Sequence, residues 1–437
     1  MVDALPFRGL RFDAAVCGAW GGLLGPPYDV VTPERAAALR AASRYQITHV
    51  ETPGAGGAES AAATLRGWRE AGALKRDPEP SYYVARHRFR QGGETRERTA
   101  LFAAVRLAPW SEAHAGGGAT KPHEWTMAGP REERTTLRAT VRADVSPLMA
   151  VAPDPSGALG QAIEAAAAGR PSAEGVDPAG DEHALFVVEG EHEVDAIRAA
   201  LARETLYMAD GHHRYESALG HREVRKRRAG ITWSGEEPEN FVLMGIVRAE
   251  DPGLIVGATH RLLHAPPPAD ALARLQAAFA VETLGPGGDA GVLTARLAAA
   301  PPERAPIGVH GLTGGDLLLL ADDRTRAALP PELPASWAGL GPAVLQHAAL
   351  GPIFGIDEAA LHAGEAVTYE HETGAACAAV AAGTAQAAFL VQAPSLGQIF
   401  EAADAGDRMP QKSTYFVPKL PTGLVLHAFD AGDDELF

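Results

Sequence analysis

The chain has 437 residues, which is enough for two or three domains with hydrophobic cores of their own. Its 46% hydrophobic and 22% charged residues are ordinary for a soluble globular protein and exclude a largely disordered chain. A formal charge of −16 argues against a protein that coats nucleic acid, and two cysteines, Cys17 and Cys377, exclude a disulfide framework and a cysteine-based zinc site. We expect a cytoplasmic protein without a signal peptide that binds neither nucleic acid nor membrane.

The first predicted elements are a loop braced by prolines and a helix. Residues 25–31 read Gly-Pro-Pro-Tyr-Asp-Val-Val, and Thr32 before Pro33 is a typical helix start, because Thr can cap the helix and Pro fits its first turn. A second helix is expected over 59–73. Asp29 is a candidate general base or metal ligand because the prolines fix its position; the alternative is that it only stabilises the turn.

Sheet structure is predicted to begin at residue 82. Residues 82–89 and 99–105 alternate or run apolar on either side of Gly92-Gly93, which is the pattern of a β-hairpin. A polar, charged stretch follows at 123–134 and leads into a helix through residue 142. Its candidate binding or catalytic residues are His123, Glu124, Thr126 and Arg134. Surface ion pairing is the alternative for its charged residues.

The most informative segment is Asp210-Gly211-His212-His213-Arg214. Residues 184–188 upstream are typical of a buried strand, and a helical pattern begins at 215, so the segment is predicted to lie on a strand-to-helix turn. The N–H groups at the start of a helix attract anions. Arg214 can bind phosphate or carboxylate through two parallel hydrogen bonds, and Gly211 allows the backbone to approach the ligand closely.

Two other interpretations of this segment stay open. Asp210 can cap the helix while Arg214 pairs with a neighbouring acid and the histidines complete a polar network. A metal ion is the second alternative. His212 and His213 diverge by about 100° on a helix, so one histidine with Asp210 suits a single ion better than both histidines do. A divalent ion brought by a nucleotide is more plausible than a structural metal.

The C-terminal half is predicted to contain a second α/β region. An apolar strand over 241–247 and the motif Thr259-His260-Arg261 precede a proline-rich boundary at 265–268. Helices are expected over 269–279 and 293–299, and strands over 307–309, 317–320, 388–391 and 423–427. Lys412-Ser413-Thr414 suits oxyanion binding, but no glycines precede it as they do in a Walker loop.

The Asp210–Arg214 segment resembles the signature of the ParB/sulfiredoxin-like superfamily, in which such a turn binds nucleotide phosphates, and it is most similar to that of free-serine kinases. Further segments resemble an uncharacterised group, DUF family 1015, over nearly the whole chain. They are residues 26–30, His123-Glu124 with Thr126, residues 134–138, Ser146-Pro147, residues 259–261 and residues 409–420.

The resemblance implies a mixed α/β or α+β fold. A ParB/sulfiredoxin-like core with an inserted hairpin and helical region is expected over 1–264, and a C-terminal α/β region over 265–437 is expected to contribute to the same cleft. The chain departs from two branches of the superfamily. It lacks the arginine pair and a clear helix-turn-helix of the DNA-partition proteins, and it lacks the reactive cysteine of sulfiredoxin.

The leading hypothesis is a phosphotransferase that uses ATP or ADP with Mg²⁺ and acts on a small hydroxylated acceptor, above all free L-serine. The expected phosphate-binding residues are Gly211, His213, Arg214, Lys412, Ser413 and Thr414. The expected catalytic residues are Glu124 as base, Asp210 or Asp29 to orient the metal or the acceptor hydroxyl, and His212. The expected substrate-binding residues are His123, Thr126, Arg134, His260 and Arg261.

Two alternatives remain. A phosphoserine-type phosphatase would use the same residues without a nucleotide. A non-catalytic nucleotide-binding switch of the ParB type would bind nucleotide and change conformation without turning over an acceptor. The sequence leaves the oligomeric state and the direction of phosphoryl transfer open.

Overall fold

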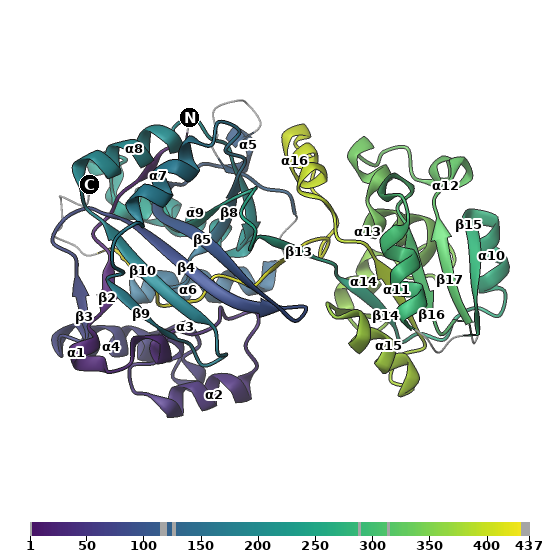
Figure 1. Cartoon of the computed structure of the whole chain (residues 1–437), viewed down its shortest axis with the longest axis horizontal. Coiled ribbons are helices and arrows are strands. Elements are labelled where there is room, and N and C mark those ends of the chain that lie inside the picture. The colour runs from purple at the N-terminus through teal and green to yellow at the C-terminus, as the bar shows by residue number, and fades with distance from the viewer. Residues whose placement is uncertain (1, 114–119, 125–127, 287–289, 313–314, 430–437) are drawn as a thin grey trace. The chain divides into compact units, whose positions relative to one another are not determined.

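The computed structural model describes residues 2–113, 120–124, 128–286, 290–312 and 315–429, and Thr126 lies outside them. The described residues form a mixed α/β structure, which confirms the predicted fold class (Figure 1). They divide into two compact units. Unit 1 comprises residues 1–122, 126–255 and 418–437, and unit 2 comprises residues 123–125 and 256–417. The predicted domain boundary at 264/265 stays a prediction.

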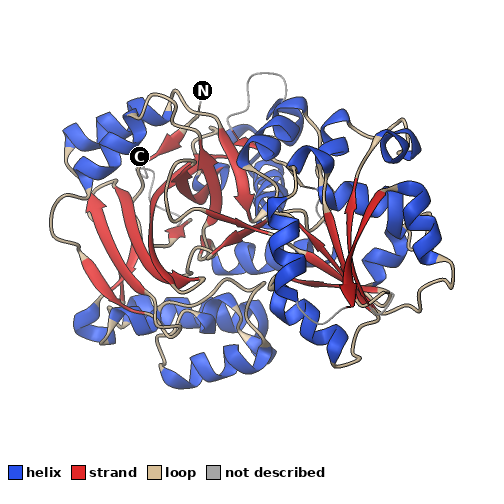
Figure 2. Ribbon diagram, turned by 45° about the vertical axis from the view of Figure 1, so that its right-hand side comes forward, coloured by secondary structure: helices blue, strands red, loops and turns tan. Residues whose placement is uncertain are grey.

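Unit 1 is built on a twisted mixed sheet (Figure 2). Only the β11–β6 and β12–β8 pairs are parallel in this sheet, as far as the chain is described. Its strands are, in spatial order, β6 (Thr120–Lys121), β11 (Leu206–Asp210), β8 (Leu148–Ala152), β12 (Phe241–Arg248), β5 (Glu94–Arg106), β4 (Tyr82–Gln91), β10 (Glu182–Val188) and β9 (Ala173–Val176), with β1 (Ala4–Leu5) beside β5. The predicted hairpin is confirmed, since Gly92 and Gly93 join β4 to β5 with positive φ angles of 59° and 85°.

Helices cover the sheet of unit 1. Apolar side chains of α7, α8 and α9 pack on one face of the sheet in a common core with alternate residues of the strands, as the period-two pattern of half-buried strands requires. The helices of the unit are α1 (Ala14–Cys17), α2 (Pro33–Ala42), α3 (Thr48–Glu51), α4 (Gly57–Glu70), α5 (Trp110–Ala113), α6 (Ala128–Val141), α7 (Ala158–Ala166), α8 (Glu191–Leu201) and α9 (His212–Ala229). Thr32 caps α2 as predicted, because its side chain accepts from the N–H of Arg35 at 3.2 Å.

The C-terminal segment 418–429 returns to unit 1, where it is visible in yellow among the purple and blue elements (Figure 1). Leu420 lies so close to Gly245 of β12 that a Cβ at that position would collide with it. Thr422 exchanges both backbone hydrogen bonds with Gly25 at 2.7 and 3.1 Å. The predicted strand 423–427 is wrong: Gly423 turns the chain with a φ of 95°, and only β21 (His427–Ala428) pairs as a strand, with β7 (Ala143–Asp144). A second small pair joins β2 (Leu10–Phe12) and β3 (Leu74–Arg76).

Unit 2 contains an antiparallel sheet with helices on both faces (Figure 2). The strands are, in spatial order, β15 (Ala280–Pro286), β17 (Gly315–Leu320), β16 (Ile307–His310), β19 (Ala387–Val391), β14 (His260–Leu263) and β18 (Val367–Glu370), and β13 (Ile255–Gly257) pairs separately with β20 (Tyr415–Val417). The helices are α10 (Ala271–Ala278), α11 (Ala290–Ala299), α12 (Asp323–Ala328), α13 (Gly341–Val344), α14 (Glu358–Ala363), α15 (Thr373–Ala381) and α16 (Leu396–Ala405). One face of the sheet packs on α10 and residues 344–350, and the other packs on α11 and α15.

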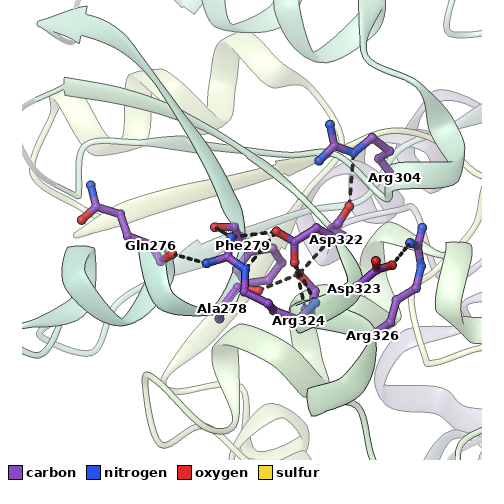
Figure 3. Close-up of polar contacts among 10 residues, drawn as sticks. Gln276, Ala278, Phe279, Arg304, Asp322, Asp323, Arg324 and Arg326 are labelled. Atoms are coloured by element: carbon purple, nitrogen blue, oxygen red, sulfur yellow. Dashed lines mark hydrogen bonds and ion pairs between the residues drawn. The ribbon is translucent and has the colours of Figure 1, made fainter.

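A polar network fixes the start of α12 in unit 2 (Figure 3). The Asp322 carboxylate accepts from the backbone N–H groups of Arg324 and Thr325, and so satisfies two helix-end donors that have no partner inside the helix. The Arg324 guanidinium bonds the same carboxylate and also donates to the carbonyls of Gln276 and Phe279 at 3.3 and 3.1 Å. The cap therefore ties α12 to the end of α10.

Candidate functional site

The strand-to-helix turn is the starting point of the site in unit 1. The prediction of such a turn at Asp210–Arg214 is confirmed, but the strand that leads into it is β11, not residues 184–188, which belong to β10 and are separated from the turn by α8. Gly211 joins β11 to α9 with a φ of 97°. A Cβ at this position would lie 3.0 Å from Leu148 Cγ and 3.2 Å from Arg214 Nη2. Both the backbone angle and the packing therefore require glycine.

Arg214 lies buried under this turn. Its guanidinium donates to Ser146 Oγ at 2.6 Å, to the Pro147 carbonyl at 2.8 Å and to Asp210 Oδ2 at 2.5 Å. Asp210 is thus the partner of Arg214 and makes no capping bond to α9. Burial alone would lower the pKa of Arg214, but the carboxylates of Asp210 and Asp29 raise it. The guanidinium is accordingly a fixed positive charge.

Lys419 completes the charged cluster. Its ammonium donates to Asp210 Oδ1 at 2.5 Å and also to Asp29 Oδ2. Burial opposes the charge of Asp210, yet Lys419 and Arg214 lower its pKa to about 2. Burial alone would lower the pKa of Lys419, but the carboxylates of Asp210 and Asp29 raise it. We call Asp29, Asp210, Arg214 and Lys419 the charged cluster; the pKa shifts of Asp210, Arg214 and Lys419 all favour their ionised forms.

A second layer of buried groups supports the loop that carries Asp29. The guanidinium of Arg134 lies 4.2 Å from the ring centre of Tyr28, in cation–π contact. Arg134 also donates to the backbone carbonyl of Glu51 at 3.1 Å, and its guanidinium is 3.5 Å from the Glu51 carboxylate. Burial raises the pKa of Glu51, and the positive charges of Arg134 and Arg214 offset this only in part. Arg134, a predicted substrate-binding residue, therefore lies beside the charged cluster in unit 1.

A pocket of about 630 Å³ opens next to these residues. Its wall is formed by Tyr28, by α2, by residues 52–58 and by Arg134 and its neighbours on α6. Pockets of this size suit small molecules of nucleotide or amino-acid dimensions. Tyr28 and Arg134 thus connect a ligand-sized pocket to the charged cluster.

The two histidines of the motif are the first residues of α9 and are half-buried. After the larger effects of Lys419 and Arg214, His212 also lowers the pKa of Asp210. The backbone carbonyl of His213 accepts from Ser217 Oγ at 2.9 Å. Among the residues that the structure describes, no three histidine, cysteine, aspartate or glutamate side chains converge in a way that would hold a metal ion.

The other candidate residues gather in unit 2. His123 Nε2 lies 2.8 Å from Thr414 Oγ1, and Glu124 Oε1 accepts from the backbone N–H of Lys412 at 3.0 Å. Arg261 is buried and donates to the carbonyl of Lys412 at 3.3 Å.

Two further candidates in unit 2 have internal partners. The hydroxyl of Ser413 is buried and donates to the carbonyl of Pro410 at 2.6 Å. His260 is buried on β14. The sequence-predicted residues therefore form two groups, one in each unit. Lys412-Ser413-Thr414 belongs to the group in unit 2, whereas Arg214 belongs to the group in unit 1.

Lys419 is the main residue that sequence reasoning missed. The Lys412-Ser413-Thr414 triplet drew attention because a lysine next to two hydroxyls is a familiar anion-binding combination. Lys419 lies in the same segment, 409–420, that carries the resemblance. Its flanking residues, Pro418 and Leu420, give no chemical signal, so only the path of residues 418–429 through unit 1 identifies it.

Comparisons with known proteins give one family and several distant structures. No curated protein matches the sequence. A solved structure titled free serine kinase in complex with AMP is similar at 13% identity with a TM-score of 0.36, over 73% of this chain and 90% of the other. A conserved hypothetical protein from Pyrococcus furiosus matches at 13% identity with a TM-score of 0.33, over 73% of this chain and 94% of the other.

SbnI with a C-terminal truncation, from Staphylococcus aureus, matches at 12% identity with a TM-score of 0.32, over 72% of this chain and 85% of the other. Within the described residues, no helix combines the length and apolar character needed to cross a bilayer. The family model described as a protein of unknown function, DUF1015, matches residues 4–335, and the chain belongs to this family.

Proposed function

We propose that the protein is a nucleotide-dependent phosphotransferase that acts on a small hydroxylated acceptor, with unit 1 as its catalytic unit. One observation carries the proposal: two cations, Arg214 and Lys419, and two carboxylates, Asp29 and Asp210, meet at the start of an 18-residue helix and next to a pocket of about 630 Å³. Phosphoryl transfer asks a protein mainly to position groups and to neutralise charge, and this set of residues can do both.

The cations would bind the phosphates. Arg214 supplies a planar guanidinium at the N-terminal turn of α9, where the helix dipole also favours an anion. Lys419 supplies a compact ammonium whose present partners are the two carboxylates. A phosphate that enters the cluster would share these cations with Asp29 and Asp210. A larger residue at position 211, which the backbone conformation disfavours, would block the approach of the phosphate.

Asp29 is the carboxylate best placed to accept a proton from the acceptor hydroxyl. Its side chain is 34% exposed, against 18% for Asp210, so it is the more accessible of the two carboxylates. The acceptor oxygen would attack the terminal phosphorus of the nucleotide as its proton passes to Asp29, and the nucleotide would leave with one phosphate fewer. Glu124, which the sequence also offers as base, lies in unit 2 and stays a candidate.

The carboxylates also suit Mg²⁺. Asp29 and Asp210 converge on a single cation, the ammonium of Lys419, so their oxygens already face one site of positive charge. Mg²⁺ commonly takes one or two protein carboxylates and completes its shell with water and substrate phosphates. Asp210 would hold the ion together with the nucleotide and leave Asp29 to accept the proton, and the ion would neutralise developing phosphate charge.

The finer parts of the proposal extend this site. Unit 1 would be the ParB/sulfiredoxin-like core, the nucleotide would be ATP or ADP, and the acceptor would be free L-serine. His212 and His213 would contact phosphate oxygens from the first turn of α9. His123, Lys412 and Thr414, which lie together in unit 2, would form a second polar site for the same chemistry. The protein would work in the cytoplasm.

The test is an assay of the full chain with Mg²⁺ and either ATP or ADP, against L-serine, L-threonine, D-glycerate and glycerol, with phosphorylated product followed by mass and by ³¹P NMR. We expect product only with nucleotide. The Lys419→Met variant should lose at least about 100-fold in kcat/KM, whereas Lys226→Met, which removes an exposed lysine of α9, should retain full activity. Phosphate release from phosphoserine without nucleotide, or no turnover of any acceptor despite nucleotide binding, would contradict the proposal.

A further inference from the structure

Unit 2 contains a cavity of about 510 Å³ that the proposed function does not use. Residues of α11, α15 and α16, the end of β19 and the segment 339–342 form its wall, and His260 of β14 lies in it. All of these residues belong to unit 2, whereas the charged cluster belongs to unit 1. Its volume lies in the range of small-molecule sites.

Two histidines, His260 and His371, are the ionisable side chains among the described residues that line this cavity. None of its described lining residues is Asp, Glu, Lys or Arg. Burial, with the nearby charges of Arg261 and His371, lowers the pKa of His260 to about 4, so its imidazole is neutral at neutral pH. A charged ligand would lose its hydration in this cavity without an Asp, Glu, Lys or Arg side chain in the wall to pair with. The wall therefore selects an uncharged molecule.

The helices that begin at the cavity do not change this conclusion. Before α15, the carboxylate of Glu370 accepts from the N–H groups of His371 and Glu372 at 2.7 and 3.0 Å, so a negative charge already faces this helix start. At α16, Ser395 and Gln398 bond each other reciprocally in a capping box. Neither helix start requires an external anion.

The hydrogen bonds of His260 leave one donor in the cavity wall. The backbone N–H of Val391 donates to His260 Nδ1 at 3.3 Å, so the ring hydrogen must be on Nε2. Nε2–H then donates to Thr373 Oγ1 at 2.9 Å. Because Thr373 accepts this bond, its own hydroxyl hydrogen is left to donate to a ligand.

Gln392 leaves one acceptor in the same wall. Its side-chain nitrogen donates to the backbone carbonyls of Leu297 and Ala300 at 2.7 and 3.0 Å. Two carbonyls can only face the NH₂ group of the amide, so both amide hydrogens are used and the orientation of the amide is fixed. The carbonyl oxygen of Gln392 is left to accept from a ligand. The remaining wall is largely apolar, with leucine, alanine, valine and proline side chains.

We propose that this cavity is a second binding site, for an uncharged molecule with an apolar body and a cis-amide edge, whose carbonyl accepts from Thr373 and whose N–H donates to Gln392. A lactam and a pyrimidine or purine base share this edge. The site gives a role to His260 that is independent of phosphoryl transfer: the imidazole orients the Thr373 hydroxyl.

The experiment measures binding to the full-length protein by isothermal titration calorimetry and by saturation-transfer NMR, without nucleotide. The probes are uracil, 2-piperidone, 1,3-dimethyluracil, which lacks the N–H donor, and orotate, which is uracil with an added carboxylate. We expect saturable binding of uracil or 2-piperidone. Tighter binding of uracil would indicate that the site takes a nucleobase, and tighter binding of 2-piperidone would indicate a simple lactam. 1,3-Dimethyluracil and orotate should bind at least about tenfold more weakly.

Three variants distinguish loss of this binding site from general damage to the fold. Thr373→Val removes the spare hydroxyl and should weaken binding of the better probe by about fivefold to tenfold, and Thr373→Ser should restore it. Thr294→Val is the matched control, because Thr294 also lines the cavity but already donates its hydroxyl to the Ala290 carbonyl at 2.6 Å. No saturable binding of uracil or 2-piperidone, orotate binding as tightly as uracil, or equal effects of the Thr373 and Thr294 variants in folded protein would overturn the proposal.

Discussion

Lys419 donates a hydrogen bond to Asp210 at 2.5 Å although 209 positions separate the two residues in sequence. The same ammonium contacts Asp29, which lies near the other end of the chain. Three segments of unit 1 that are far apart in sequence therefore meet at the Lys419 ammonium. Arg214 is linked to this charge through Asp210, so a substitution at any of the four residues changes the electrostatic environment of the others.

The Lys419–Asp210 pair should be strongly coupled in stability. Lys419→Met leaves the half-buried carboxylate of Asp210 and the more exposed carboxylate of Asp29 with one cation fewer, and we expect it to lower the free energy of unfolding by about 3 kcal/mol. Asp210→Asn alone should also destabilise the protein. The double variant should lose clearly less than the sum of the two single losses, because the unpaired charges are then removed together. Urea unfolding of all four proteins measures the coupling, and strict additivity would show that the pair contributes nothing.

Asp29→Asn should separate chemistry from binding. If Asp29 accepts the proton of the acceptor, the variant should lower kcat by about 100-fold to 10,000-fold and leave nucleotide affinity nearly unchanged. Glu124→Gln is the parallel probe for the base that the sequence suggests in unit 2. Steady-state kinetics with calorimetric nucleotide binding distinguishes the two candidates. A larger loss of kcat in Glu124→Gln than in Asp29→Asn would transfer the role of base to Glu124.

Gly211→Ala tests the turn that holds the site. At a φ of 97° alanine is strained, and its Cβ would lie 3.0 Å from Leu148 Cγ. We expect a loss of about 2 kcal/mol in the free energy of unfolding and a large loss of phosphate binding. Gly220→Ala is the matched control on α9, since a Cβ there meets nothing within 4 Å. It should stabilise the protein by about 0.5 to 1 kcal/mol, and equal effects of the two variants would show that the turn needs no glycine.

Asp144 should make the stability of unit 1 sensitive to acid. It is buried and bonds Arg138 at 2.7 Å; burial would raise its pKa, but Arg138 and His427 lower it to about 2. A pKa below the ordinary value of 3.8 means that the folded state favours the ionised form. The resulting stabilisation, about 2 kcal/mol, is fully present above pH 4 and is lost as the pH falls through 2.

Unfolding by urea at pH 7, 4, 3 and 2 checks this dependence. Asp144→Asn should lower stability at pH 7 and flatten the decrease between pH 4 and 2. Asp270→Asn is the control, because Asp270 pairs with Arg274 on the exposed surface, where an ion pair contributes little. A wild-type protein that keeps its full stability at pH 2 would contradict this role of Asp144.

Arg134→Lys tests the layer behind the cluster. Arg134 lies over the Tyr28 ring and bonds the Glu51 carbonyl with a planar group that lysine cannot reproduce. We expect a loss of about 1 kcal/mol in stability and weaker ligand binding in the adjacent pocket. Glu132→Gln, which changes an exposed carboxylate of α6 that does not line the pocket, should change neither property measurably. Equal behaviour of the two variants in unfolding and nucleotide titrations would remove Arg134 from the site.

The sequence by itself determined the local parts of this protein. The cap at Thr32, the Gly92-Gly93 hairpin and the turn from β11 into α9 depend on neighbouring residues, whose conformational preferences are legible in a short window. For the same reason the sequence could place Gly211 and Arg214 on a strand-to-helix turn, for which we propose anion binding. The strand before the turn was misplaced to 184–188 because apolar runs look alike and only pairing distinguishes them.

Only the tertiary structure decided which distant charges meet. Lys412 had the better local pattern, yet Lys419 joins Asp29 and Asp210, because residues 418–429 return to unit 1 through backbone bonds such as those between Thr422 and Gly25. The false strand at 423–427 has the same origin, since these residues are buried in unit 1 and turn at Gly423 instead of extending a sheet. Contacts between residues that are hundreds of positions apart depend on packing and long-range strand pairing, and no local conformational preference encodes them.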